Sequence, residues 1–214
     1  MASSPIKGAR VRECRSFGWG VVTSFDIDGP LLIEPKTYHD TRGYFRESFN
    51  WWALMESGYS QFEQPFVQDN ESRSHFYVLR GLHFQRGQDA QAKLVRVPHG
   101  GIFDVAADLR PGSPTFGRWL GVRLTHENGA MLYVPRGFAH GFLTEDWGDT
   151  VVAYKCDGYY RASACGGVRW DDPDLGIEWP AVGLSRAMLD AKDRNWPLLK
   201  ELGADPTEFA KMSG

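Results

Sequence analysis

Residues 78–85 read Val78-Leu79-Arg80-Gly81-Leu82-His83-Phe84-Gln85, a short β-prone run with one histidine among apolar neighbours. In an unbroken strand alternate side chains face opposite sides, so Arg80 and His83 would be parted. Gly81 permits a bend or bulge that relaxes this alternation. Histidine titrates near neutrality and is well suited to take a proton from a carbon acid at pH 7. A satisfied core histidine is the commoner explanation for one His alone, so the case for catalysis depends on its neighbours, Lys93 among them.

Runs of this kind recur along the chain from residue 31 onward. Short β-prone segments alternate with Gly, Pro, Asp and Asn. They cover residues 31–34, 44–49, 66–69, 77–84, 93–97, 102–109, 119–124, 131–134, 141–144 and 151–155. Many short strands at this spacing predict an all-β sandwich or jelly roll. Two helical segments are expected to interrupt it, at residues 51–57 and at about 185–202.

Length and composition bound the domain organisation. The 214 residues, 42% hydrophobic and 14% aromatic, suffice for one sizeable core. We predict a single domain over residues 25–214, preceded by an N-terminal extension over residues 1–24. Glycines among mixed polar residues predict little intrinsic structure up to about residue 22.

Charge and cysteine usage exclude several classes of protein. A net charge of -3 and a pI near 6.1 argue against a general nucleic-acid binder. Cys14, Cys156 and Cys165 form no CxxC pair and are odd in number, which fits a reducing compartment better than a disulfide framework or zinc knuckle. The chain shows neither a signal-peptide-like start nor an apolar run of about 18 residues. We therefore expect a soluble, cytoplasmic protein without a membrane partner.

Nine motifs follow one another in order along the chain. They are RGYFRESF at 42–49, FVQDN at 66–70, LRGLH at 79–83, KLVR at 93–96, FDV at 103–105, GSPTFG at 112–117, PRGFAHGF at 135–142, YK at 154–155 and YY at 159–160. Together these motifs closely resemble the dTDP-4-dehydrorhamnose 3,5-epimerase family, over roughly residues 25–200. Their ordered co-occurrence outweighs the unremarkable explanation that each residue has alone.

The resemblance implies a cupin-like jelly roll and a homodimer that exchanges N-terminal strands. It also implies cofactor-independent inversion at C3 and C5 of dTDP-4-dehydro-6-deoxy-D-glucose, which gives dTDP-4-dehydro-L-rhamnose. By position, His83 resembles the catalytic base and Asp193 its orienting partner. Tyr154 resembles the acid that returns a proton on the other face, and Lys93 the cation beside the C4 oxygen.

General chemistry justifies the same residue types. A proton next to a ketone leaves only if the enolate oxygen is stabilised, and a preorganised cation such as Lys93 can supply several kcal/mol there. Inversion needs a donor opposite the histidine, and a tyrosine meets that need. An aspartate on the far ring nitrogen fixes the tautomer and stabilises the imidazolium. His83 and Asp193 form such a pair only if the C-terminal segment folds back.

The resemblance assigns a second group of residues to the nucleotide half of the substrate. Arg80 and Lys192 suit diphosphate or ribose, and Gln68 and Asn70 could bind the edge of a pyrimidine whose face stacks on Phe45 or Tyr160. The full set is Arg42, Phe45, Glu47, Gln68, Asp69, Asn70, Arg80, His140, Tyr160 and Lys192.

A metal site is the main alternative role for the histidines, because cupins often bind metal. Such a site needs paired histidines in an HxH arrangement and a carboxylate on adjacent strands. His83 has no second histidine at that spacing, and His140 stands apart in the sequence. We therefore predict no metal and no other cofactor.

The chain departs from the family pattern in two places. Cys165 stands where the family usually has a glutamate that contacts substrate, and its loss removes a hydrogen-bond acceptor. Residues 75–77, His-Phe-Tyr, are bulkier than the family's usual small residues and could narrow the pocket.

Two alternatives to a 3,5-epimerase remain open. One is a single-site epimerase, acting at C3 or C5 of a related nucleoside diphosphate 4-keto sugar. The other is a non-catalytic cupin that binds a sugar nucleotide. The joint presence of His83, Lys93, Tyr154 and Asp193 favours an enzyme, because a mere binder needs no acid and base on opposite faces.

Overall fold

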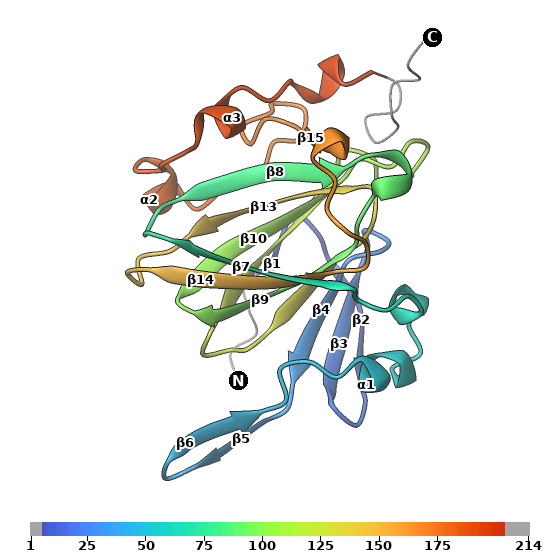
Figure 1. Cartoon of the computed structure of the whole chain (residues 1–214), viewed down its shortest axis with the longest axis vertical. Coiled ribbons are helices and arrows are strands. Elements are labelled where there is room, and N and C mark those ends of the chain that lie inside the picture. The colour runs from blue at the N-terminus through green and yellow to red at the C-terminus, as the bar shows by residue number, and fades with distance from the viewer. Residues whose placement is uncertain (1–5, 204–214) are drawn as a thin grey trace.

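Two antiparallel sheets face each other in the computed structural model, which describes residues 6–203 (Figure 1). Sheet A has the strand order β1 (Ile6–Lys7), β11 (Trp119–Thr125), β10 (Gly101–Asp108), β13 (Phe138–Thr144), β8 (Leu79–Gln85), β15 (Cys165–Gly167). Sheet B has the order β2 (Val11–Ser16), β3 (Gly20–Phe25), β4 (Leu31–Pro35), β12 (Met131–Val134), β9 (Lys93–His99), β14 (Thr150–Cys156), β7 (Gln68–Ser74). The predicted all-β antiparallel fold is therefore confirmed.

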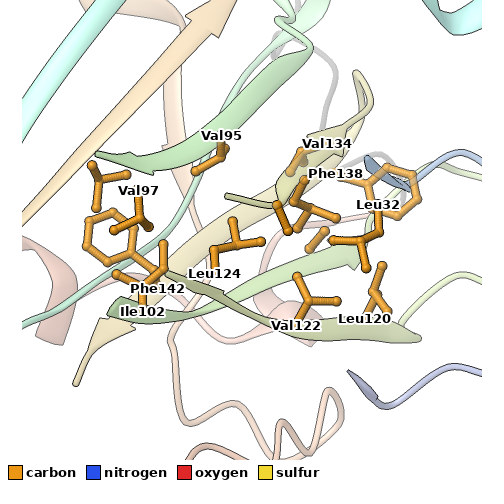
Figure 2. Close-up of a cluster of buried hydrophobic side chains, with 14 of the residues drawn as sticks. Leu32, Val95, Val97, Ile102, Leu120, Val122, Leu124, Val134, Phe138 and Phe142 are labelled. Atoms are coloured by element: carbon orange, nitrogen blue, oxygen red, sulfur yellow. The ribbon is translucent and has the colours of Figure 1, made fainter. Parts of the chain in front are cut away.

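The main core fills the space between the sheets. Figure 2 shows its side chains, among them Val95 on β9, Ile102 on β10 and Phe142 on β13. These strands contribute every second residue to this core, as the alternation of a pleated strand requires. Residues of β10 between those positions, such as Phe103 and Val105, point to the opposite face of sheet A. All eight residues of β10 are buried because both faces of the strand are covered.

Separate elements cover the outer face of each sheet. The C-terminal segment, with α2 (Ala181–Leu184), α3 (Ala191–Arg194) and η4 (Leu199–Glu201), packs against sheet A through residues such as Trp179 and Leu199. On sheet B, α1 (Trp51–Glu56) and η1 (Ser60–Phe62) bury Leu54 and Phe62. The remaining short 3-10 helices are η2 (Gly87–Asp89) and η3 (Ala162–Ala164).

A two-stranded hairpin, β5 (Thr37–Asp40) and β6 (Gly43–Arg46), projects away from the two sheets (Figure 1). It carries exposed aromatic side chains, with Tyr38 at 61%, Tyr44 at 56% and Phe45 at 69% exposure. The strand expected at residues 44–49 corresponds to β6, which ends at Arg46 and pairs with β5.

The expectation of little structure before residue 22 is wrong. Residues 6–25 contribute β1 to sheet A and β2 and β3 to sheet B, and the expected boundary at residues 24 and 25 falls inside β3. All six residues of β2 are exposed, so this strand has no apolar alternation to detect in the sequence.

The predicted helix at residues 51–57 is confirmed as α1, which Asn50 caps by accepting a hydrogen bond from the Ala53 amide. The continuous C-terminal helix expected at 185–202 is wrong. Asp190 caps the four-residue α3 by accepting a hydrogen bond from the Lys192 amide, and Pro197 follows the end of the helix, since proline cannot continue a helix. Upstream, Met188 instead makes a bridge to Val78.

Candidate active site

A cavity of about 380 Å³ opens between the two sheets, within the range of about 300–1,000 Å³ typical of small-molecule sites. Both sheets and the C-terminal segment contribute to its wall. The lining residues are Gln68, Asn70, His83, Phe84, Gln85, Gln91, Lys93, Tyr154, Cys156, Tyr160, Cys165 and Lys192.

A bulge in β8 brings Arg80 and His83 to the same side of sheet A. On the neighbouring β13, Phe142 lies opposite Arg80 and His140 lies opposite His83. On β8, two residues separate Arg80 from His83. On β13, only Gly141 separates His140 from Phe142, so β8 carries the extra residue. The bend expected at Gly81 is confirmed.

Glycine is required at this bulge. Gly81 has φ +128°, and a Cβ there would lie 2.5 Å from the Cα of Gly141. Because Gly81 and Gly141 have no side chains, β8 and β13 can approach closely at the bulge, and this bulge positions His83.

The C-terminal segment does fold back onto His83. Nε2 of His83 lies 2.5 Å from Oδ1 of Asp193, which sits on α3, 110 residues further along the chain. Asp193 also accepts hydrogen bonds from the Gly81 amide (3.2 Å) and from Trp196 Nε1 (3.3 Å). The predicted pair is thus formed, with the carboxylate buried and held by three donors.

The pKa of Asp193 lies below its usual value. Burial acts to raise this pKa, but the hydrogen bond and electrostatic attraction of His83, together with the Gly81 and Trp196 donors, outweigh burial. Asp193 is therefore an ionised acceptor that orients the imidazole of His83.

Sheet B supplies the lysine and the tyrosine. Lys93 is half-buried on β9, and burial lowers its pKa, while Cys156, Asp104 and Cys165 act in the opposite direction. Tyr154 is half-buried on β14, and burial raises the pKa of its hydroxyl, which keeps it protonated and able to donate. Both face the cavity that His83 lines from sheet A.

His140 lies next to His83 in sheet A but does not form part of the cavity wall. It is buried, and its Nε2 lies 2.7 Å from Oδ1 of Asp104 on β10. The sequence predicted that His140 binds substrate and predicted no role for Asp104. The signal for Asp104 was nonetheless present, since it is a charged residue in the middle of a fully buried apolar strand.

Some of the predicted nucleotide-binding residues lie around the cavity or in a hollow beside it. Gln68, Asn70, Tyr160 and Lys192 line the cavity. Arg80 lines an adjoining hollow of about 410 Å³ that shares His83 and Lys192 with it. The structure therefore brings these residues together around the candidate base.

Four other predicted residues do not reach this cavity within the protomer. Asp69 pairs with Lys155 at 2.7 Å outside it. Arg42 pairs with Asp40 on the projecting hairpin, where Phe45 is also exposed. Glu47 follows the hairpin and accepts a hydrogen bond from Asn50 Nδ2 at 3.1 Å.

Cys165 lines the mouth of the cavity, where Lys192 Nζ donates to its Sγ at 3.3 Å. Cys156 is a wall residue that sequence analysis missed, and burial raises the pKa of its thiol to about 11. The bulky residues 75–77 line neither the cavity nor the adjoining hollow, so they do not narrow the site as expected.

Within residues 6–203, no three His, Cys, Asp or Glu side chains are grouped so that they could hold a metal ion. In the same part of the chain, no helix has the length and apolarity to cross a membrane.

The fold and the cavity define a two-sheet β protein with a small-molecule site between its sheets. The family model described as dTDP-4-dehydrorhamnose 3,5-epimerase matches residues 24–201. The enzyme of that name from Methanothermobacter thermautotrophicus is 51% identical over 175 residues, covering 82% of this chain and 92% of the relative. The chain therefore belongs to the dTDP-4-dehydrorhamnose 3,5-epimerase family, whose members are isomerases of sugar nucleotides.

Solved structures agree with this assignment. A dTDP-6-deoxy-D-glucose-3,5-epimerase from Legionella pneumophila in complex with dTDP-4-keto-L-rhamnose matches with a TM-score of 0.80 and 43% identity, covering 87% of this chain and 96% of that one. ChmJ from Streptomyces bikiniensis, a 3'-monoepimerase in complex with dTDP-quinovose, matches with a TM-score of 0.75 and 33% identity, covering 83% and 87%. One fold thus serves both double and single epimerases.

Proposed function

We propose that this protein epimerises C3 and C5 of dTDP-4-dehydro-6-deoxy-D-glucose to give dTDP-4-dehydro-L-rhamnose, without a cofactor. One observation carries the proposal: His83 and Tyr154 line the same cavity from opposite sheets, with Lys93 in the same wall. A base and an acid on facing walls are what inversion at a carbon requires.

In this mechanism, His83 removes the proton next to the C4 ketone. Asp193 holds the ring and stabilises the imidazolium that forms. Lys93 stabilises the negative charge that develops on the C4 oxygen. Tyr154 then donates its proton to the carbon from the other side, and the configuration inverts.

The nucleotide half lies along the residues near the cavity mouth. Lys192 and Arg80 are cations placed to bind the diphosphate, and Gln68 and Asn70 offer amide groups to the base. Tyr160 is 56% exposed, so its ring is accessible for stacking on a base.

The active protein in this proposal is a homodimer. The hairpin that carries Arg42 and Phe45 projects from its own protomer (Figure 1). Its aromatic side chains are exposed, and neither Arg42 nor Phe45 lines the cavity of its own protomer. A second copy would receive the hairpin, so that each cavity is completed by its partner. Complementation tests this directly: inactive Arg42→Ala and His83→Asn variants should regain activity when mixed, because a mixed dimer contains one intact site. Absence of recovery despite mixed dimers would contradict a shared site.

A single-site epimerase is the second candidate, favoured by the likeness to ChmJ. Incubation with several nucleoside diphosphate 4-keto sugars in deuterium oxide separates the possibilities. A 3,5-epimerase incorporates deuterium at both carbons, and a single-site enzyme at one. Incorporation at neither carbon of any sugar would show a non-catalytic binder.

A further inference from the structure

Three polar or charged residues interrupt the apolar core between the sheets. On β9, β10 and β13, the residues that alternate with Lys93, Asp104 and His140 all belong to the core shown in Figure 2. Because alternate residues of a strand face the same side, these three side chains also face the space between the sheets. The flanking core residues are Val95, Ile102, Ala106, Phe138 and Phe142.

Burying the carboxylate of Asp104 at this position has a high free-energy cost. It is fully buried, and a buried carboxylate is strongly unfavourable unless it is paired. One oxygen, Oδ1, lies 2.7 Å from His140 Nε2. The other, Oδ2, is buried without a hydrogen-bond partner in the part of the chain that the structure describes. Packing alone does not account for such a group.

Between residues 6 and 203, Asp104 is the one carboxylate among the groups that raise the pKa of Lys93, the others being the thiols of Cys156 and Cys165. Burial favours the neutral amine of Lys93 and lowers its pKa, and the negative charge of Asp104 opposes that effect. A lysine that stabilises an enolate must carry its charge, so this opposition bears on the reaction.

We propose that Asp104 is a positioning residue: it fixes the imidazole of His140 and keeps Lys93, in the cavity wall, in its charged form. The link to catalysis rests on the proposed function, in which Lys93 stabilises the enolate. Several other titratable or charged groups face the cavity around Lys93 or adjoin it: Cys156 and Tyr154 on β14, His83 and Arg80 on β8, His140 on β13, Cys165 on β15 and Lys192 on α3.

The test removes the charge of Asp104 and keeps its shape. In Asp104→Asn, the amide oxygen can still accept the hydrogen bond from His140. The pKa of Lys93, followed by NMR on protein with ε-¹³C-labelled lysine and without substrate, should fall by about one unit, a tenfold change in acidity. The alkaline limb of the kcat profile should move to lower pH by the same amount, with KM little changed. The Lys93 signal is assigned by its loss in Lys93→Arg.

Asp108→Asn is the matched control. Asp108 is also fully buried on β10, but it is bound by Arg110, Ser113 and Thr115 and does not contribute to the pKa of Lys93. This variant should lose thermal stability while the Lys93 titration and the pH profile stay in place.

An unchanged Lys93 titration in Asp104→Asn would overturn the proposal, whatever the enzyme's substrate. A lowered titration in a protein that epimerises no sugar would instead leave the role of Asp104 standing and refute the proposed function. If the variant does not fold, ¹⁵N-histidine NMR of the unmodified protein decides: Nε2 of His140, 2.7 Å from Oδ1 of Asp104, should carry the proton of this hydrogen bond. A bare Nε2 would require the proton to lie on Asp104, and the proposal would then be wrong.

Discussion

Sheet A and sheet B bring different chemistry to the same cavity. On sheet A, His83 and His140 are each bound to a carboxylate, at 2.5 Å and 2.7 Å. On sheet B, Lys93 and Tyr154 have no carboxylate hydrogen bond within residues 6–203. Burial lowers the pKa of Lys93 and raises that of Tyr154, so it favours the neutral form of both side chains. Hydrogen bonds to carboxylates therefore hold the two histidines of one wall. On the other wall burial favours the neutral forms, and the negative charge of Asp104 opposes burial at Lys93.

This difference assigns the two walls to opposite halves of a proton transfer. A histidine oriented by an ionised aspartate is equipped to accept a proton, and a buried tyrosine is equipped to give one. Exchange needs abstraction by His83 and stabilisation of the enolate by Lys93, whereas net epimerisation also needs the proton that Tyr154 donates. Substitution of His83 or of Tyr154 separates the two contributions.

The largest effect should come from His83→Asn, which disables the wall of sheet A. Exchange at both carbons should fall by about 10² to 10⁴ in rate, the usual range for a lost general base. Affinity for dTDP should be nearly unchanged, because the nucleotide contacts come from other side chains. Solvent-deuterium exchange and dTDP titration measure the two. The control His140→Asn should lose less, since His140 does not line the cavity. Rates within a few-fold of the unmodified protein would show that His83 is not the base.

Tyr154→Phe should disable the wall of sheet B, since it keeps the ring and removes the hydroxyl. Epimer formation should fall by about 10², the lower end of the range for a lost proton-transfer group. Exchange should fall less, because abstraction by His83 survives. The ratio of the two rates, measured in one deuterium oxide experiment, gives the result. Equal losses would mean that Tyr154 only positions the sugar.

Asp193→Asn should lower the free energy of unfolding by about 2 kcal/mol at pH 7, as expected for a hydrogen bond to a charged group. The folded-state pKa of Asp193 is depressed, so the folded state binds fewer protons than the unfolded state at acidic pH. The stability from its carboxylate is present above about pH 3.9 and is lost as the pH falls through the lower folded value. The difference between variant and unmodified protein, from urea unfolding, should therefore shrink below about pH 4.

A surface pair provides the control for this measurement. Asp171→Asn removes the partner of the partly exposed Arg169 and should cost less than about 1 kcal/mol. A difference for Asp193→Asn that grows towards acidic pH would contradict the assigned direction of its pKa.

In sheet A, the feature of the site that the sequence predicted best is the bulge in β8. Gly81 predicted this bulge. Only a glycine tolerates the positive φ at this position and the close approach of Gly141. The partner of His83 could not be found from local pattern, since Asp193 is 110 residues away and only the family resemblance pointed to it.

Elements without an apolar pattern escaped prediction. The strand β2 is exposed along its whole length, and residues 185–202 hold their shape through contacts with sheet A and not through helical periodicity. Asp104 was visible as a charge among apolar residues, but its partner His140 lies on another strand, and strand pairing is not local information.

The smallest effect should come from Cys165→Glu at the mouth of the cavity. Cys165 stands on β15 and receives a hydrogen bond from Lys192 Nζ. The family resemblance leads us to expect a glutamate at this position. A restored carboxylate should add about one hydrogen bond to the nucleotide, on the order of 0.5–1.5 kcal/mol, and tighten dTDP binding up to about tenfold. The rate of chemistry should change little, because the gain is common to ground and transition states and leaves both walls intact. Calorimetric titration with dTDP measures the gain, and Cys14→Glu on the exposed β2 is the control that should show none. Unchanged or weaker dTDP binding, alongside tight binding of another nucleoside diphosphate by the unmodified protein, would show that the mouth of this cavity is built for a different base.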